Sequence, residues 1–187
     1  MKKIIATLIM LVFPYDFAIS KTHYLPEHLK QFKKTKSCIN CDLSSAKLNW
    51  SNYKDSILTG TDLTNAELNQ SNFDNSIFSQ TVLIKAYLAS AFFIKSNFDG
   101  ANLISANCSY SKFSGASFKG SNLNGVNFFD ANLSNVNFEN ASLKNTNLNY
   151  SILIGAKITT SQLSEVKSKQ CAVMPNGEIY DPDNEGC

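Results

Sequence analysis

The residues best suited to chemistry in this 187-residue chain are its five cysteines. Cys38 and Cys41 form a C-x-x-C pair, Cys171 and Cys187 lie near the carboxyl end, and Cys108 stands alone between the two pairs. Four thiolates can bind a zinc ion, a C-x-x-C pair can exchange electrons with a disulfide, and cysteines of an exported chain pair as structural disulfides. The choice depends on how far apart the pairs lie, and therefore on the elements that carry them.

Other chemically active groups are sparse. His23 and His28 are the only histidines, too few for a metal site of their own, and we expect both at the surface. Residues 41–165 contain no His and no Arg, and hold eight Lys against nine Asp plus Glu. Because an enzyme needs convergent groups in a concave pocket, this composition predicts a protein that is not an enzyme, with no catalytic residue, no cofactor and no metal.

A five-residue period runs from Cys41 to Glu165. Every fifth residue from Leu43 to Leu163 is Leu, Phe, Tyr, Ile or Cys, and the residue two places earlier is Ala, Ser, Thr, Val or Cys. On an extended backbone these two side chains point to the same side. Two places after the large residue come Gly, Asn or Asp in many units, which tolerate the positive φ of a turn. The period therefore predicts a solenoid of stacked units and excludes an α-helix, whose apolar residues it would scatter around the axis.

The units resemble a known repeat. Ala131-Asn132-Leu133-Ser134-Asn135 and Ser121-Asn122-Leu123-Asn124-Gly125 are similar to the A-(D/N)-L-x-x consensus of the pentapeptide-repeat family, and the resemblance covers about two thirds of the chain. It implies an all-β fold, a right-handed quadrilateral β-helix with 20 residues per coil, and so about six coils over residues 41–165. The flanks Lys36–Ala46 and Cys171–Cys187 resemble the C-x-x-C-(D/N)-L-S-x-A and C-x-x-x-M-P-(D/N)-G…G-C motifs of exported members.

A 20-residue coil predicts which outward charges are neighbours, because residues 20 apart then lie about 4.8 Å apart along the axis. Asp42 and Asp62 are the only like-charged pair; they could share a proton or hold a cation, but we interpret them as a tolerated surface repulsion. Four pairs have opposite signs, namely Lys47 with Glu67, Lys54 with Asp74, Asp99 with Lys119, and Lys119 with Glu139.

Residues 1–20 have the pattern of a secretory signal. Lys2 and Lys3 form a basic start, residues 4–13 are an apolar run, and small residues precede an expected cleavage after Ser20. The apolar run is too short for a membrane anchor. We therefore expect a periplasmic or secreted protein with no stable membrane insertion after cleavage.

The two flanks of the repeat are predicted to close its ends, since a β-helix leaves an open apolar mouth at each end. Residues 21–40 predict a short amphipathic helix that starts near Pro26 and turns Leu29 and Phe32 onto the first coil. Binding of its lysines to anionic lipid or polysaccharide is the alternative. Residues 166–187 predict a second cap, for which the chain supplies Val173, Met174, Ile179 and Tyr180.

This architecture decides among the cysteine chemistries. The rod would be ~30 Å long, so the two cysteine pairs lie at opposite ends and cannot share one metal ion. We predict the disulfide Cys171–Cys187, with Cys108 as a buried free thiol. Cys38 and Cys41 either form a disulfide at the mouth of the rod or stay reduced, since a C-x-x-C bond is strained and reducible. A thioredoxin-like role for the C-x-x-C pair lacks the βαβ context that such a role requires.

Two surface features remain. Asn107, Asn127 and Asn147 form one predicted column and Tyr110, Asp130 and Tyr150 another; amide ladders stabilise stacked strands, and faces of amides and aromatic rings also bind sugars. The second feature is a set of outward apolar residues in the middle of the repeat, which predicts a contact surface or the resting place of a flanking segment. This contact patch consists of Val82, Ile84, Tyr87, Phe92, Ile94 and Ile104.

The sequence thus predicts an exported, non-enzymatic scaffold or protein-interaction module whose partner is an unknown protein or envelope component, with a homodimer as a further option. The competing hypothesis comes from the best-known members of the resembled family, which mimic DNA and bind type II topoisomerases. Such mimicry needs a strongly acidic face, whereas residues 41–165 are nearly neutral, so we expect no role with nucleic acid or its enzymes.

Overall fold

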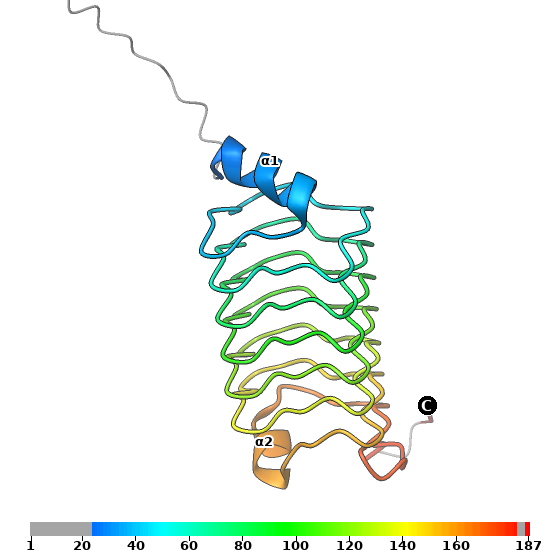
Figure 1. The fold of residues 1–187 in the computed structure, drawn as a ribbon. Coiled ribbons are helices and arrows are strands. Elements are labelled where there is room, and N and C mark those ends of the chain that lie inside the picture. The colour runs from blue at the N-terminus through cyan, green and yellow to red at the C-terminus, as the bar shows by residue number, and fades with distance from the viewer. Residues whose placement is uncertain (1–23, 183–185) are drawn as a thin grey trace, which may run out of the picture.

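The computed structural model describes residues 24–182 and 186–187, which form a rod of stacked coils between two short helices (Figure 1). Helix α1 spans Pro26–Thr35 and helix α2 spans Thr160–Glu165. The predicted signal at residues 1–20, as well as His23, lies outside the described residues. No helix within the described part of the chain is long and apolar enough to cross a lipid bilayer.

The coils pair through single parallel β-bridges rather than through long strands. Up to Lys157, each bridge joins residues 20 apart, as in Asn72 with Phe92 and Asn97 with Ser117. A strand cannot extend further because every fifth residue turns the chain through a corner with positive φ, as Gly100 does at 66°. The 20-residue register predicted from the sequence is therefore confirmed, and outward residues 20 apart stack along the rod.

The inward residues form one continuous core along the axis. Every large residue of the period from Leu43 to Leu153 is buried. Aromatic rings stack from coil to coil, with centroids 5.6 Å apart for Phe73 and Phe93 and 4.9 Å apart for Phe93 and Phe113. Each such side chain contributes about 1.5–3 kcal/mol to folding by leaving water. The predicted alternation of large and small inward residues is confirmed, and it leaves the rod filled.

Buried hydroxyl groups satisfy the backbone at the small inward positions. Thr81 Oγ1 donates to the Leu58 carbonyl at 2.9 Å, and Ser96 Oγ donates to the Phe73 carbonyl at 2.7 Å. Throughout the described residues, every buried side-chain nitrogen or oxygen atom has a hydrogen-bond partner. An unpaired buried polar group would cost about 1–3 kcal/mol, so this complete pairing lets Ser and Thr replace Ala in the core.

Helix α1 lies across the amino-terminal end of the rod (Figure 1). Pro26 occupies its first turn, where the missing N–H costs nothing, and Lys36 ends it with φ 55°. Phe32 is buried, and its ring centroid lies 4.8 Å from that of Tyr53 in the first complete coil. Because α1 is polar on its other side, its lysines remain exposed.

The five-residue period ends earlier in the structure than we predicted. Residues 160–165 form α2 instead of a coil unit, because Thr159 and Gln162 make a capping box that starts a helix. The sheet then resumes, and Asn147 bridges Ser168, a separation of 21 rather than 20 residues. The predicted boundary of the β-helix at residue 165 is therefore wrong: α2 interrupts the sheet, and the following segment continues it.

Most of the predicted charge pairs do not form ion pairs, although their register is correct. Among the described residues one salt bridge occurs, between Lys119 Nζ and Glu139 Oε2 at 3.4 Å. Asp99 instead accepts from the backbone N–H of Lys119 at 3.0 Å, and Asp74 accepts from the backbone N–H of Ile94 at 2.8 Å. Exposed ion pairs gain little in water, so a carboxylate takes the nearer fixed donor.

Candidate functional site

Two disulfides are present, the predicted Cys171–Cys187 and the Cys38–Cys41 bond that the sequence left open. The Cα atoms are 5.5 Å apart in Cys38–Cys41 and 5.4 Å apart in Cys171–Cys187. Cys38 is fully buried and Cys41 is 6% exposed. Because thiol exchange requires attack on an accessible sulfur, a bond this well covered is a structural clip at the end of the rod rather than a redox centre.

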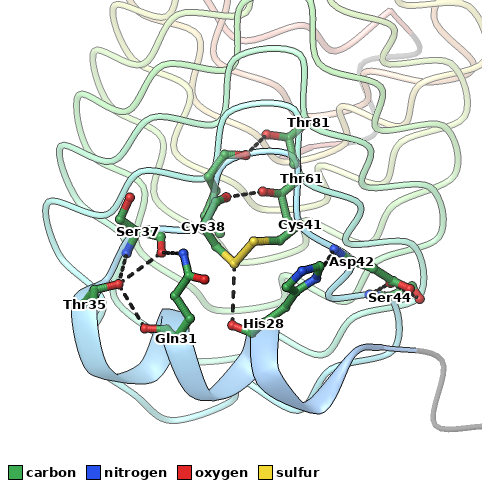
Figure 2. The surroundings of a disulfide bond; sticks show 11 residues. His28, Gln31, Thr35, Ser37, Cys38, Cys41, Asp42, Ser44, Thr61 and Thr81 are labelled. Carbon is green, nitrogen blue, oxygen red and sulfur yellow. Dashed lines mark hydrogen bonds between the residues drawn. A yellow bond between two sulfur atoms is a disulfide. The ribbon is translucent and has the colours of Figure 1, made fainter.

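Helix α1 covers the Cys38–Cys41 bond through contacts that Figure 2 shows. The Nδ1 atom of His28 accepts a hydrogen bond from the backbone N–H of Asp42 at 3.0 Å. The Sγ atom of Cys38 lies 3.5 Å from the carbonyl oxygen of His28, which is a contact without a proton because both cysteines are oxidised. His28 is thus half-buried between α1 and the first coil, and our prediction of a surface histidine is wrong in this respect.

Cys108 is the single free thiol of the described residues, and it is fully buried in the axial core as predicted. Burial raises the pKa of its thiol far above the ordinary value, because the charged thiolate would lose its hydration. The thiolate is the nucleophilic form, so Cys108 packs in the core as an apolar, protonated side chain.

The stacked carboxylates Asp42 and Asp62 form no shared site. Their residues bridge, but each Oδ1 atom turns to its own coil and accepts from the backbone N–H two residues on, at 3.0 Å for Ser44 and 2.8 Å for Thr64. No group of three or more His, Cys, Asp or Glu side chains within the described ranges is placed to hold a metal ion.

The contact patch lies in the middle of the rod, between the ends that α1 and α2 occupy (Figure 1). Its residues all take outward positions, on three successive sides of the coil. Tyr87 is 49% exposed and the other five members are half-buried. Lys112 Nζ lies 5.1 Å from the ring centroid of Phe92 and partly covers it. Neither helix reaches this patch, so among the described residues the chain's own ends do not cover it.

The sequence analysis missed a second apolar group on the fourth side of the rod. Ile57 and Ile77 bridge each other, Ile39 lies close to the same end, and all three are exposed. The signal was available, because the same 20-residue register that defined the contact patch also aligns Ile57 with Ile77.

The predicted amide ladder is confirmed. Asn127 Nδ2 donates to Asn107 Oδ1 at 3.3 Å, and Asn147 Nδ2 donates to Asn127 Oδ1 at 3.0 Å. Tyr110 and Tyr150 lie beside this ladder at the next corner. Phe129, which we had not included, lies between them with ring centroids 5.6 and 5.2 Å away. Amides and aromatic rings therefore form two parallel lines along one edge of the rod.

A hollow of about 540 Å³ lies where α2 leaves the sheet. Gln162 Nε2 donates into its wall, to the carbonyl oxygens of Phe138 and Ala141 at 2.7 and 2.8 Å. At Ala141 it replaces the backbone donor that a further regular coil would supply, whereas the Phe138 carbonyl also accepts from the backbone N–H of Ala141. Glu139, which also lines the hollow, forms the ion pair with Lys119. The hydroxyl of Thr159, which also lines the hollow, takes part in the capping box and accepts from the backbone N–H of Gln162 at 3.1 Å.

Comparison with known proteins identifies the class to which this rod belongs. One family model, described as a pentapeptide repeat region, matches residues 91–167, and another, described as pentapeptide repeats (8 copies), matches residues 41–80. Together they take in more than half of the chain. The chain belongs to the pentapeptide-repeat family, whose fold is a right-handed quadrilateral β-helix. No protein with a curated description matches it.

Solved structures agree with this fold. The chain is 23% identical to Rfr23, a pentapeptide repeat protein from the cyanobacterium Cyanothece 51142, over 68% of this chain and 97% of that one, with a TM-score of 0.50. HetL, involved in heterocyst differentiation regulation in Nostoc sp. strain PCC 7120, is 20% identical over 77% and 81% of the two chains, with a TM-score of 0.35. QnrB1, a plasmid-mediated fluoroquinolone resistance protein, is 14% identical over 78% and 75%, with a TM-score of 0.40. Only the first likeness bears on the fold, and none bears on function.

Proposed function

We propose that this protein is an exported, non-enzymatic interaction module that presents a partner protein with the contact patch of Val82, Ile84, Tyr87, Phe92, Ile94 and Ile104. The observation that carries the proposal is that these outward apolar residues share neighbouring coils in the middle of the rod, away from both helices. The outward positions of most other coils are Asn, Ser, Thr or charged, so this coil departs from a merely solvated surface.

The rod favours such a role because it holds the patch rigidly. Val82 and Ile84 flank the buried Leu83, and Phe92 and Ile94 flank the buried Phe93, so each pair is anchored by a core residue. A surface that is already ordered loses little conformational entropy on binding. We therefore expect the partner to bring a complementary apolar surface, as protein partners do, with little change in the rod itself.

Export is part of the proposal. Two disulfides within a chain of this size favour an oxidising compartment, which is consistent with the signal pattern at residues 1–20. The mature protein would then begin after Ser20 and act in the periplasm or outside the cell. Mimicry of DNA finds no support in the nearly neutral charge of residues 41–165.

The contact patch can be tested by placing a charge in it. Ile84→Glu and Phe92→Glu should each prevent recovery of a crosslinked partner from native envelopes, because burying an unpaired carboxylate at an apolar interface is unfavourable. Thr64→Glu is the matched control, since Thr64 lies one coil from Ile84 in the same column but contributes no apolar surface.

The same variants show whether the partner is a second copy. If light scattering gives a dimer for the native protein and a monomer for Ile84→Glu, a second copy occupies the patch. Recovery of the same partners by all three variants, together with an unchanged mass, would show that the patch is not a contact surface.

A further inference from the structure

One corner of the rod differs from the other three. Every unit between residues 40 and 155 ends in a residue with positive φ. Gly or Asn fills 12 of the 18 such positions along three corners. Along the remaining corner they fill none of six, although φ there is 53–60°. The residues of this corner, in order along the rod, are Trp50, Gln70, Ser90, Tyr110, Asp130 and Tyr150.

Bulky side chains at this corner work against the backbone. A left-handed conformation is unfavourable for any residue with a Cβ atom and is unusual for a large one. Trp50, Tyr110 and Tyr150 nevertheless occupy it, with φ of 59°, 60° and 60°. Gly or Asn, which fill most positions of the other corners, would be less strained here, so the rings are kept against a conformational preference.

The rings of Tyr110 and Tyr150 are held at a defined spacing. The two residues share a column two coils apart, which places them about 9.6 Å apart at about 4.8 Å per coil. They are 54% and 48% exposed. Phe129 supports both from between, with ring planes inclined at 70° to Tyr110 and 58° to Tyr150. Tyr110, Phe129 and Tyr150 form what we call the aromatic strip.

The chemistry beside the aromatic strip is polar and almost uncharged. The amide ladder of Asn107, Asn127 and Asn147 runs parallel to it on the same side of the rod. In the three units that end at this corner, residues 106–110, 126–130 and 146–150, Asp130 is the only charged residue. Of the neighbouring lysines, Lys112 lies over the ring of Phe92 and Lys169 over the ring of Tyr180, so their charges are not gathered at the strip as a phosphate site would require. Exposed aromatic rings, amides and one carboxylate match instead the CH faces and hydroxyl groups of a sugar.

We propose that the aromatic strip binds an uncharged, extended β-1,4-linked glycan lying along the rod. In such a chain every second sugar presents the same face, and its repeat is close in length to two coils of the rod. One sugar stacks on Tyr110 and the next but one on Tyr150. Asp130, in the same column between them, accepts hydrogen bonds from hydroxyl groups, and the asparagine amides supply further polar groups. This inference goes beyond the protein contact proposed above and does not rest on it.

Calorimetric titration of the mature, disulfide-bonded protein tests the proposal. The probes are the β-1,4-linked hexamers of N-acetylglucosamine and of glucose, with the α-1,4-linked glucose hexamer as the probe of wrong geometry. We expect at least one β-linked hexamer to bind and the α-linked one not to bind. Tyr110→Asn and Tyr150→Asn should each weaken binding about tenfold or more, which is a shift of about 1.4 kcal/mol or more.

Asparagine is chosen because it suits positive φ, so these variants should fold and their melting temperatures should stay close to that of the native protein. Ile77→Asn is the matched control, since Ile77 is exposed on the opposite side of the rod, away from the amide ladder; it should leave glycan affinity unchanged. Ile84→Glu should do the same, which separates this test from that of the contact patch.

Three results would overturn the proposal. The first is the absence of binding to both β-linked hexamers at millimolar concentration. The second is equal affinity for the α-linked hexamer, which would remove the argument from spacing. The third is an affinity that Tyr110→Asn and Tyr150→Asn leave unchanged, or that Ile77→Asn lowers as much as they do.

Discussion

Phe118→Asp is the most direct test of the filled axis. The Phe118 side chain is fully buried, and its ring stacks between those of Phe98 at 4.8 Å and Phe138 at 5.8 Å. The substitution removes both stacking contacts and places a carboxyl group where no donor is free to receive it. We expect the mature protein not to fold.

The magnitude follows from two contributions. Removing a buried Phe side chain costs about 3–5 kcal/mol, as Phe→Ala substitutions in cores do. The introduced carboxyl can escape charge only by staying protonated, and at pH 7 that costs about 4 kcal/mol for a group with an ordinary pKa near 3.9. The sum, about 7–9 kcal/mol, is comparable to the whole stability of a typical domain, about 5–15 kcal/mol.

Circular dichroism and thermal melting measure the outcome. The matched control is Asn124→Asp, which introduces the same group at an outward position. Asn124 Oδ1 accepts from Ser142 Oγ at 2.6 Å and from the backbone N–H of Lys144 at 3.0 Å, and a carboxylate keeps both bonds. The control should melt close to the native protein. A β signal and melting temperature unchanged by Phe118→Asp would refute the placement of Phe118 in the axis.

Three further predictions concern the cysteines and α2. Burial raises the pKa of the Cys108 thiol above its ordinary value of 9.0, so above about pH 9 the unfolded chain loses this proton and the folded chain keeps it. The free energy of unfolding should therefore fall with rising pH, by up to about 1.4 kcal/mol per pH unit. Urea titrations would measure this fall, and Cys108→Ala should remove the contribution. Mild reductant should open Cys171–Cys187, whose Cys187 is exposed, before the bond beneath α1, as mass spectrometry of alkylated cysteines would show; simultaneous opening would contradict the cover by α1. Gln162→Ala should destabilise the carboxyl-terminal end by about 1–3 kcal/mol, since it leaves the Ala141 carbonyl without a donor and breaks the capping box with Thr159, and hydrogen exchange confined to that end would measure it.

The positions of the inward side chains could be predicted because the five-residue period is compatible with only one arrangement of the chain. A large residue at every fifth position can be buried continuously only if each unit turns one corner. The stacking of Phe73, Phe93 and Phe113 follows from this requirement alone. The outward register follows from the same count. For this reason the pairing of Asn107 with Asn127 was readable from the sequence.

Predictions failed where two local solutions compete. Residues 160–165 satisfy the period as well as earlier units do, yet the capping box of Thr159 and Gln162 makes them helical. The choice depends on whether another coil lies beyond them, which no local pattern records. The charged residues do lie in the predicted register, but the period does not decide which groups bond: Asp99 has a lysine in the next coil, and its carboxylate accepts from the backbone N–H of that lysine instead.

The candidate surfaces could likewise be predicted in part from the sequence and in part only from the structure. The sequence by itself determined which residues face outward and which lie above one another, because both are consequences of counting by 5 and by 20. Only the tertiary structure decided which outward neighbours touch. The ring of Phe129 lies between those of Tyr110 and Tyr150 although it belongs to a different column, and α1 places His28 against the backbone N–H of Asp42. Both contacts depend on three-dimensional packing rather than on the period.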